Sequence, residues 1–320
     1  MTDADVRAHS GWANLEVDVD SETVQRLLAM RSKLEGLEES SFGFNLTEHQ
    51  RMATVVVVVA ACAFYVILSL RASVKARRLA LAHVLDETVA TSRRVSPLAM
   101  LLWRSAAAVF IFASYFSGWA TSSPRVKFMR VSTFTCWSWF MMGVYFCVAA
   151  LATLLHMSGR RLPSMLKATI WAMFEALTPV SILVCLVVWF VLIPMFQASN
   201  NVVALRIMFS WFGLAAHNAN VVLMAVELLL NRLSFNDSHM PFVIIYGLVY
   251  LAFAMYLWRA TGVLFYFFLD YTLPFAWVAY LALLGVIVAS FKVTEHAAGA
   301  IKKRETPKSS SDGAPKAKGA

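Results

Sequence analysis

Residues 53–70 of the chain read ATVVVVVAACAFYVILSL, an apolar run without a charged side chain. An α-helix rises ~1.5 Å per residue, so roughly 20 apolar residues cross the ~30 Å of hydrocarbon in a bilayer. This run therefore predicts a transmembrane helix. Six further stretches of the same character follow, near 98–118, 132–155, 170–195, 207–230, 241–258 and 273–293.

The composition of the whole chain favours a lipid environment. Of the 320 residues, 59% are hydrophobic and 15% are charged, whereas soluble domains carry about 25% charged residues. So much apolar surface does not fit inside one soluble core of this length, and in lipid the backbone must satisfy its own hydrogen bonds. The sequence therefore predicts an all-α fold, a polytopic membrane helix bundle with about seven transmembrane helices.

The predicted spans divide the chain into four parts. Residues 1–51 form an acidic soluble tail, in which Ser21 to Leu37 has a partial apolar stripe and predicts a short amphipathic helix. Residues 52–97 hold an extra transmembrane helix and a basic loop, and residues 98–293 form a six-helix membrane domain. Residues 294–320 predict a disordered basic tail.

The distribution of Lys and Arg predicts the orientation of the bundle. If the N-terminus lies outside, the inside segments 71–97, 156–169, 231–240 and the C-terminal tail hold seventeen Lys and Arg, against ten in the outside segments. Positive residues concentrate on the cytoplasmic side of membrane proteins. The N-terminus is therefore predicted to be outside (lumenal) and the C-terminus cytosolic.

The end of the chain predicts a compartment. It reads Lys316-Ala317-Lys318-Gly319-Ala320, with lysines at the third and fifth positions from the end. This pattern resembles the dilysine signal that retrieves membrane proteins to the endoplasmic reticulum. We therefore expect the protein in the endoplasmic reticulum or another endomembrane.

Several other classes of function lack their sequence signals. The cysteines, Cys62, Cys136, Cys147 and Cys185, all lie in apolar stretches, which is typical of small buried side chains and not of a disulfide framework. The spacing of Cys and His is not that of a zinc site, and the chain has no Gly-rich phosphate loop. We therefore expect no metal and no cofactor. We expect no nucleic-acid partner, because no basic patch is interleaved with aromatic residues.

The fifth apolar stretch carries polar groups at membrane depth. On a helix, His217, Asn220, Met224 and Glu227 fall within about 80° of one another. Polar groups are costly in hydrocarbon, so this stripe must face protein or water. A buried histidine taken alone is more often a structural hydrogen-bonding group than a catalytic one. We interpret Glu227 as a partner for another helix or for water.

A second candidate group lies at the start of the third stretch. Thr135, Ser138 and Trp139 share one helix face there, although a membrane threonine usually bonds back to its own backbone. Thr135 and His217 are predicted at depths that differ by only ~9 Å. A threonine hydroxyl needs a neighbouring base to become a nucleophile, and imidazole is the usual base at neutral pH. The two residues are therefore a candidate catalytic pair.

Two charged residues fall inside predicted spans. Arg104 lies in the second stretch and Glu175 near the inner end of the fourth. A long arginine side chain can reach the membrane surface or pair with an acid. We interpret both residues as interfacial charges.

The spacing of these residues resembles that of a known family. Thr135 is followed ten and eleven residues later by Tyr145-Phe146, and His217 lies six residues after Trp211 and ten before Glu227. In these intervals the chain resembles the androgen-induced-protein family, intramembrane threonine hydrolases that cleave fatty acid esters of hydroxy fatty acids. The resemblance implies that Thr135 is the nucleophile and His217 the acid and base.

The resemblance covers roughly residues 98–293. Residues 261–270 read TGVLFYFFLD and are similar to a Thr-Gly, Tyr, Phe-Leu-acid run of the same family. It implies a lipid ester that reaches the site laterally from the bilayer. In such a mechanism Asn218, Asn220 or Ser138 would donate to the oxyanion, and the sequence does not choose among them.

Other residues leave alternatives open. Asn218-Ala219-Asn220 stands where the hydrolases tend to have threonines, and Phe267 where they tend to have proline. The His-Asn pair and Leu269-Asp270-Tyr271 are similar to the related rolling stone family, multispan membrane proteins linked to cell fusion. One alternative is therefore a non-catalytic membrane protein in which His217, Asn220 and Glu227 join helices. Another is a transporter or channel, although the sequence shows no inverted repeat.

Overall fold

The computed structural model describes residues 47–72 and 85–305, together with a few isolated positions between 25 and 36. Seven of its helices are long and apolar enough to cross a membrane. The predicted polytopic helix bundle is therefore confirmed, and the chain is an integral multi-pass membrane protein. The amphipathic helix expected at 21–37 lies largely outside the described residues, and so does the tail beyond 305.

The helices follow the predicted stretches closely. The first three spans are α3 (Glu48–Ala72), α6 (Pro97–Phe116) and α8 (Phe134–Met157). The fourth is α9 (Ser164–Val187), which continues through a π-helical turn (Val188–Leu192) into α10 (Ile193–Ala198). The last three are α12 (Trp211–Leu214) with a π-helical turn (Ala215–Ala219) and α13 (Asn220–Leu230), then α14 (Met240–Thr261) and α15 (Ala276–Glu305).

Short elements connect the spans. They are α5 (Asp86–Ala90), α7 (Pro124–Ser132), α11 (Val202–Met208) and two 3₁₀ turns, Asp237–His239 and Phe267–Leu269. The apolar run after Arg259 does not extend α14, because Gly262 adopts a left-handed conformation with φ of 73° and ends the helix. Residues 263–275 therefore form a loop that returns to the bundle before α15.

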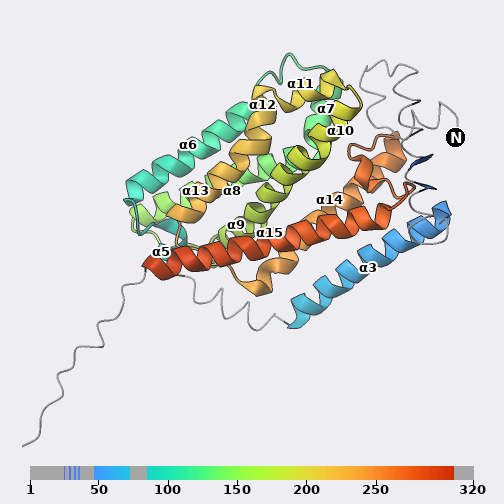
Figure 1. The fold of residues 1–320 in the computed structure, drawn as a ribbon. Coiled ribbons are helices and arrows are strands. Elements are labelled where there is room, and N and C mark those ends of the chain that lie inside the picture. Colours follow the sequence, from blue (N-terminus) through green and yellow to red (C-terminus); the bar gives the residue numbers. More distant parts are fainter. Residues whose placement is uncertain are drawn as a thin grey trace, which may run out of the picture.

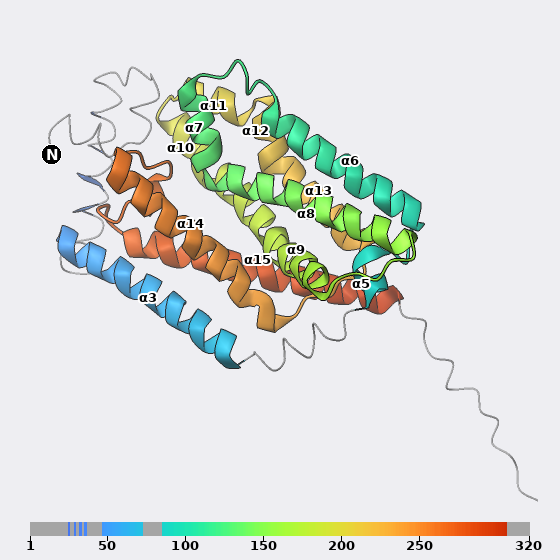
Figure 2. The same ribbon diagram turned by 180° about the vertical axis from the view of Figure 1, so that it is seen from behind.

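The bundle has α9 near its centre and α3 at one edge (Figures 1 and 2). Helix α9 contacts α8, α13, α14 and α15, whereas the contacts of α3 with other spans are made to α14 and α15. Only 11% of the most apolar window of α3 is buried in the protein. The first span is therefore an outer helix that packs mainly against α14 and α15.

A proline explains the π-helical turn that follows α9. Pro194 has no N–H to donate to the carbonyl of Phe190, so the regular helical pattern fails one turn before it. The chain passes this point as a π-helical turn, a local widening that is common at functional sites. The indole N–H of Trp189 in this turn donates to Asn218 Oδ1 in the second π-helical turn, at 2.7 Å.

Helix α15 continues beyond residue 293, where the tail was predicted to begin. Ala298 is buried and Ile301 packs against the main core cluster. Lys302 Nζ donates to the carbonyls of Leu228, at 3.1 Å, and Asn231. These contacts pack the polar end of the helix against the bundle. A prediction from apolar residues alone does not include them, so it ended the helix too early.

An ion pair joins two spans in the interior of the bundle. Arg104 Nη2 on α6 lies 2.8 Å from Glu227 Oε1 on α13, and both side chains are fully buried. Arg104 Nη1 also donates to Thr153 Oγ1, at 2.8 Å, and Tyr145 Oη donates to Glu227 at 2.9 Å. The interpretation of Arg104 as an interfacial charge is therefore wrong.

Glu175 is also buried, so its interpretation as an interfacial charge is wrong as well. Its carboxylate accepts the N–H of Asn236 at 2.6 Å and contacts Nδ1 of His239. Like Arg104, it lies inside a membrane span, in the middle part of α9, and faces the protein interior.

Candidate functional site

Thr135 stands in the first turn of α8 and is 8% exposed. Its N–H is one of the amides that an α-helix leaves without an internal partner, and it donates to Tyr266 Oη at 3.4 Å. Other membrane threonines of this chain, Thr153 and Thr178, bond to the carbonyl four residues earlier. At Thr135 the neighbouring polar group is instead the Tyr266 hydroxyl, which the loop after α14 supplies.

His217 is placed by the π-helical turn Ala215–Ala219 and is 6% exposed. Upstream, Ser210 caps α12 by accepting the N–H of Gly213 at 3.0 Å. Gly213 permits a close approach, since a Cβ there would lie 2.3 Å from the carbonyl oxygen of Ile207. Among the described residues, Nδ1 of His217 has no hydrogen-bond partner.

Thr135 and His217 line the same cavity, of about 50 Å³. Residues from α7, α8, α11, α12 and the loop after α14 surround it: Met129, Thr133, Cys136, Leu192, Ile207, Met208, Phe212, Gly213, Phe265 and Tyr266. A cavity needs only ~10–15 Å³ to hold one water. With a hydroxyl, an imidazole and a phenol in its wall, this small cavity has room and partners for a few waters.

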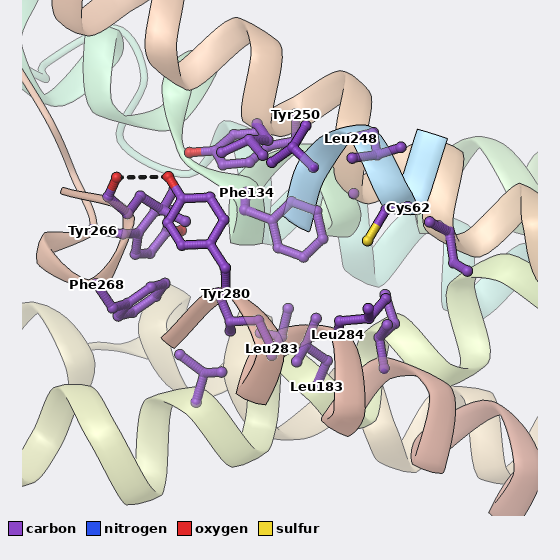
Figure 3. Close-up of a pocket in the computed structure, with 18 of the residues that line it drawn as sticks. Cys62, Phe134, Leu183, Leu248, Tyr250, Tyr266, Phe268, Tyr280, Leu283 and Leu284 are labelled. Atoms are coloured by element: carbon purple, nitrogen blue, oxygen red, sulfur yellow. Dashed lines mark hydrogen bonds between the residues drawn. The ribbon is translucent and has the colours of Figure 1, made fainter. Parts of the chain in front are cut away.

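Thr135 also lines a second, larger cavity of about 160 Å³. Figure 3 shows residues that line this cavity. Aliphatic and aromatic side chains from α3, α9, α14 and α15 dominate its wall. Three residues line both cavities: Thr135, Leu192 and Tyr266. Thr135 therefore stands between an apolar space and a smaller, more polar one.

Tyr266 is a site residue that sequence reasoning noted only within a resemblance. Burial raises the pKa of this phenol to about 12, so the group keeps its proton at physiological pH. A neutral phenol beside Thr135 can donate a hydrogen bond to a group that enters either cavity. Its position, far along the chain from α8, gives no local signal in the sequence.

The structure places the other predicted site residues away from both cavities. Ser138 Oγ bonds to the carbonyl of Phe134 at 2.9 Å, and Asn218 accepts from Trp189. Asn220 Nδ2 lies 3.5 Å from the carbonyl of Ser181, and Glu227 pairs with Arg104. None of these four residues lines a cavity with Thr135 or His217.

Within the described residues, no group of three or more His, Cys, Asp or Glu could hold a metal ion. Comparison with protein-family models, with curated proteins and with solved structures finds no match to this chain.

Proposed function

We propose that the protein is an intramembrane hydrolase of fatty acid esters, with Thr135 as nucleophile and His217 as general base and acid. The observation that carries this proposal is the position of Thr135 between the two cavities. An ester of a fatty acid needs apolar space for its chain, while the base and the water need a polar space. The two cavities meet both needs on either side of one hydroxyl.

The reaction has two steps. Thr135 Oγ1 attacks the ester carbonyl while His217 takes its proton, and His217 then returns this proton to the leaving alkoxide. The product is an acyl-threonine and a free alcohol. His217 next takes a proton from a water in the small cavity, the resulting hydroxide attacks the acyl carbon, and the proton goes back to Thr135 Oγ1. The ester is thereby converted into one acid and one alcohol.

Charge on the carbonyl oxygen needs a donor during both attacks. The Tyr266 hydroxyl lies next to Thr135 and lines both cavities. We assign it the oxyanion role for which the sequence had offered Asn218, Asn220 and Ser138. Preorganised donors of this kind are among the largest contributions to catalysis by hydrolases.

The substrate class follows from the family resemblance of Thr135, His217 and the 261–270 run. It implies fatty acid esters of hydroxy fatty acids, which are membrane-soluble and reach the site laterally from the bilayer. Hydrolysis of such lipids would place the protein in lipid metabolism.

The experiment compares matched hydroxyl deletions on one helix. Purified wild-type protein, Thr135→Ala and Ser138→Ala are incubated with palmitoyl-hydroxystearate, and the released palmitate is quantified. We expect Thr135→Ala to lose turnover by at least ~10³-fold. Ser138→Ala should keep turnover, because Ser138 lines neither cavity. Full turnover by folded Thr135→Ala would overturn the assignment.

A proposed location accompanies this function. The bias of Lys and Arg supports an N-terminus in the lumen and a cytosolic C-terminus, and the terminal lysines support retrieval to the endoplasmic reticulum. A double substitution, Lys316→Ala with Lys318→Ala, should release a tagged protein to later compartments. An unchanged distribution by microscopy would argue against the signal.

One set of contacts favours a second, non-catalytic candidate. Glu227 and Asn220 already bond to other helices, as expected of a rolling stone-like protein in which polar residues join spans. Interhelical bonds of this kind average under ~1 kcal/mol. A fluorophosphonate probe separates the two candidates, since only an activated hydroxyl is labelled covalently.

A further inference from the structure

The larger cavity runs from Thr135 to the first span. Its wall includes Val58, Val59 and Cys62 of α3, and the Cys62 sulfur points into the space in Figure 3. The opposite wall comes from α9 and α15, with Leu183, Leu283 and Leu284. The cavity therefore lies between the outer helix and the rest of the bundle.

Two tyrosine hydroxyls at this cavity are bonded to the backbone. Tyr280 Oη donates to the carbonyl of Leu269 at 2.8 Å, the bond drawn in Figure 3. Tyr250 Oη donates to the carbonyl of Ser132 at 3.1 Å. The part of a ligand that lies in this cavity away from Thr135 thus meets a largely apolar surface. This surface favours a ligand that has no polar group in that part, because an unpaired buried polar group is costly.

The size of the cavity fits part of a hydrocarbon chain. An apolar cavity of ~150 Å³ stays dry and binds a six-carbon ring. The present cavity, of about 160 Å³, accommodates a similar number of methylene groups. Gly247 on α14 keeps part of the space open, since a Cβ there would have no atom within 4 Å.

We propose that this cavity binds one hydrocarbon chain of a lipid, and that α3 is the wall that separates the chain from the bilayer. The extra first span thus contributes to the ligand site through Val58, Val59 and Cys62. The proposal that a hydrocarbon chain binds here rests on the size and lining of the cavity alone. Its use as the acyl subsite of Thr135 rests on the proposed hydrolase function.

Photo-crosslinking tests the site. The full-length protein in nanodiscs is exposed to methyl palmitate carrying a diazirine midway along its chain, with and without excess methyl palmitate, and adducts are mapped by mass spectrometry. We expect competitor-sensitive adducts on Val58, Val59 and Cys62 of α3 and on Leu283, Leu284 and Ile287 of α15, which line the cavity. Gly247→Leu should reduce them several-fold by filling the cavity.

Gly285→Leu is the matched control. Gly285 lies on α15, also has open space at its Cβ and lines neither cavity. Its adducts should equal those of the wild type. The proposal would be overturned if excess methyl palmitate did not reduce the yield of adducts, or if Gly247→Leu formed as many adducts as the wild type.

Thr135→Ala distinguishes this site from the hydrolase function. Loss of turnover with unchanged adducts supports both proposals. Competitor-sensitive adducts without turnover by the wild type would leave the lipid site standing and remove the hydrolase. Turnover by the wild type without such adducts would support the hydrolase and remove the lipid site.

Discussion

Thr135 lies in the wall that two cavities share, and His217 lies in the wall of only the smaller one. In the proposed mechanism, this arrangement would separate the apolar part of the substrate from the base and the water. The two residues would then differ in their effects: loss of Thr135 would remove the nucleophilic oxygen, whereas loss of His217 would remove proton transfer and leave the apolar cavity intact.

His217→Ala should therefore lower turnover by roughly 10²–10⁴-fold, the usual contribution of a general base. Added imidazole should restore part of this activity, since the variant leaves a space where His217 stood. Thr135→Ala should show no such rescue. The measurement is the rate of ester hydrolysis against imidazole concentration, and an equal response of both variants would contradict the role of His217.

Tyr266→Phe should lower kcat by about 10²-fold or more and leave KM nearly unchanged, because an oxyanion donor acts mainly in the transition state. Tyr246→Phe is the control. Its hydroxyl lies 3.3 Å from Ser138 Oγ, and it lines neither cavity at Thr135. Steady-state kinetics with the ester substrate check this, and equal effects of the two substitutions would count against Tyr266.

The buried pair of Arg104 and Glu227 predicts a coupled effect on stability. Glu227→Leu leaves a buried guanidinium without its carboxylate and should cost about 3–5 kcal/mol. Arg104→Met combined with Glu227→Leu should recover much of this loss, because neither charge then remains. The stabilities of the wild type, the two single variants and the double variant form a double-mutant cycle. They are measured by thermal unfolding of the purified proteins, monitored by tryptophan fluorescence. Additive losses would contradict direct coupling.

Asp86 predicts an acid dependence outside the membrane. Its carboxylate accepts the N–H of Leu162 at 2.8 Å, and this bond, followed by Lys167, lowers its pKa below the usual 3.8. A carboxyl with a lowered folded pKa stabilises the protein above pH 3.8, and this stabilisation disappears as the pH falls through the folded pKa.

Asp86→Asn should therefore reduce stability at pH 7 by up to about 1 kcal/mol, since the group is partly exposed. The difference from wild type should shrink below pH 3.8. Glu87→Gln is a control on the same short helix, with a side chain 61% exposed. Melting curves at both pH values test this; a pH-independent difference would indicate lost packing rather than lost charge.

Hydropathy predicted the membrane helices well because lipid imposes one simple condition on a span, a sufficient length of apolar residues. The ends of the spans were less accurate. Helix α14 continues beyond the predicted end at residue 258 to Thr261, where Gly262 stops it, and α15 continues into a polar sequence. Both outcomes depend on local backbone geometry and on packing that composition does not encode.

The polar residues were harder to place, because helix periodicity does not fix how two helices are rotated about their axes. Arg104 and Glu227 are 123 residues apart, and nothing local indicates that they meet. The π-helical turn at Ala215–Ala219 also changes the register after His217, so a stripe drawn at 100° per residue does not hold through it. Asn220 consequently faces Ser181 and not the small cavity.

Covalent labelling of the purified protein with an alkyl fluorophosphonate tests directly whether Thr135 is a nucleophile activated by His217. The adduct is mapped by peptide mass spectrometry in the wild type and in His217→Ala. We expect an adduct on Thr135 whose formation falls at least about 10²-fold in His217→Ala. An adduct on another residue, or none on Thr135 in protein that hydrolyses the ester, would contradict it.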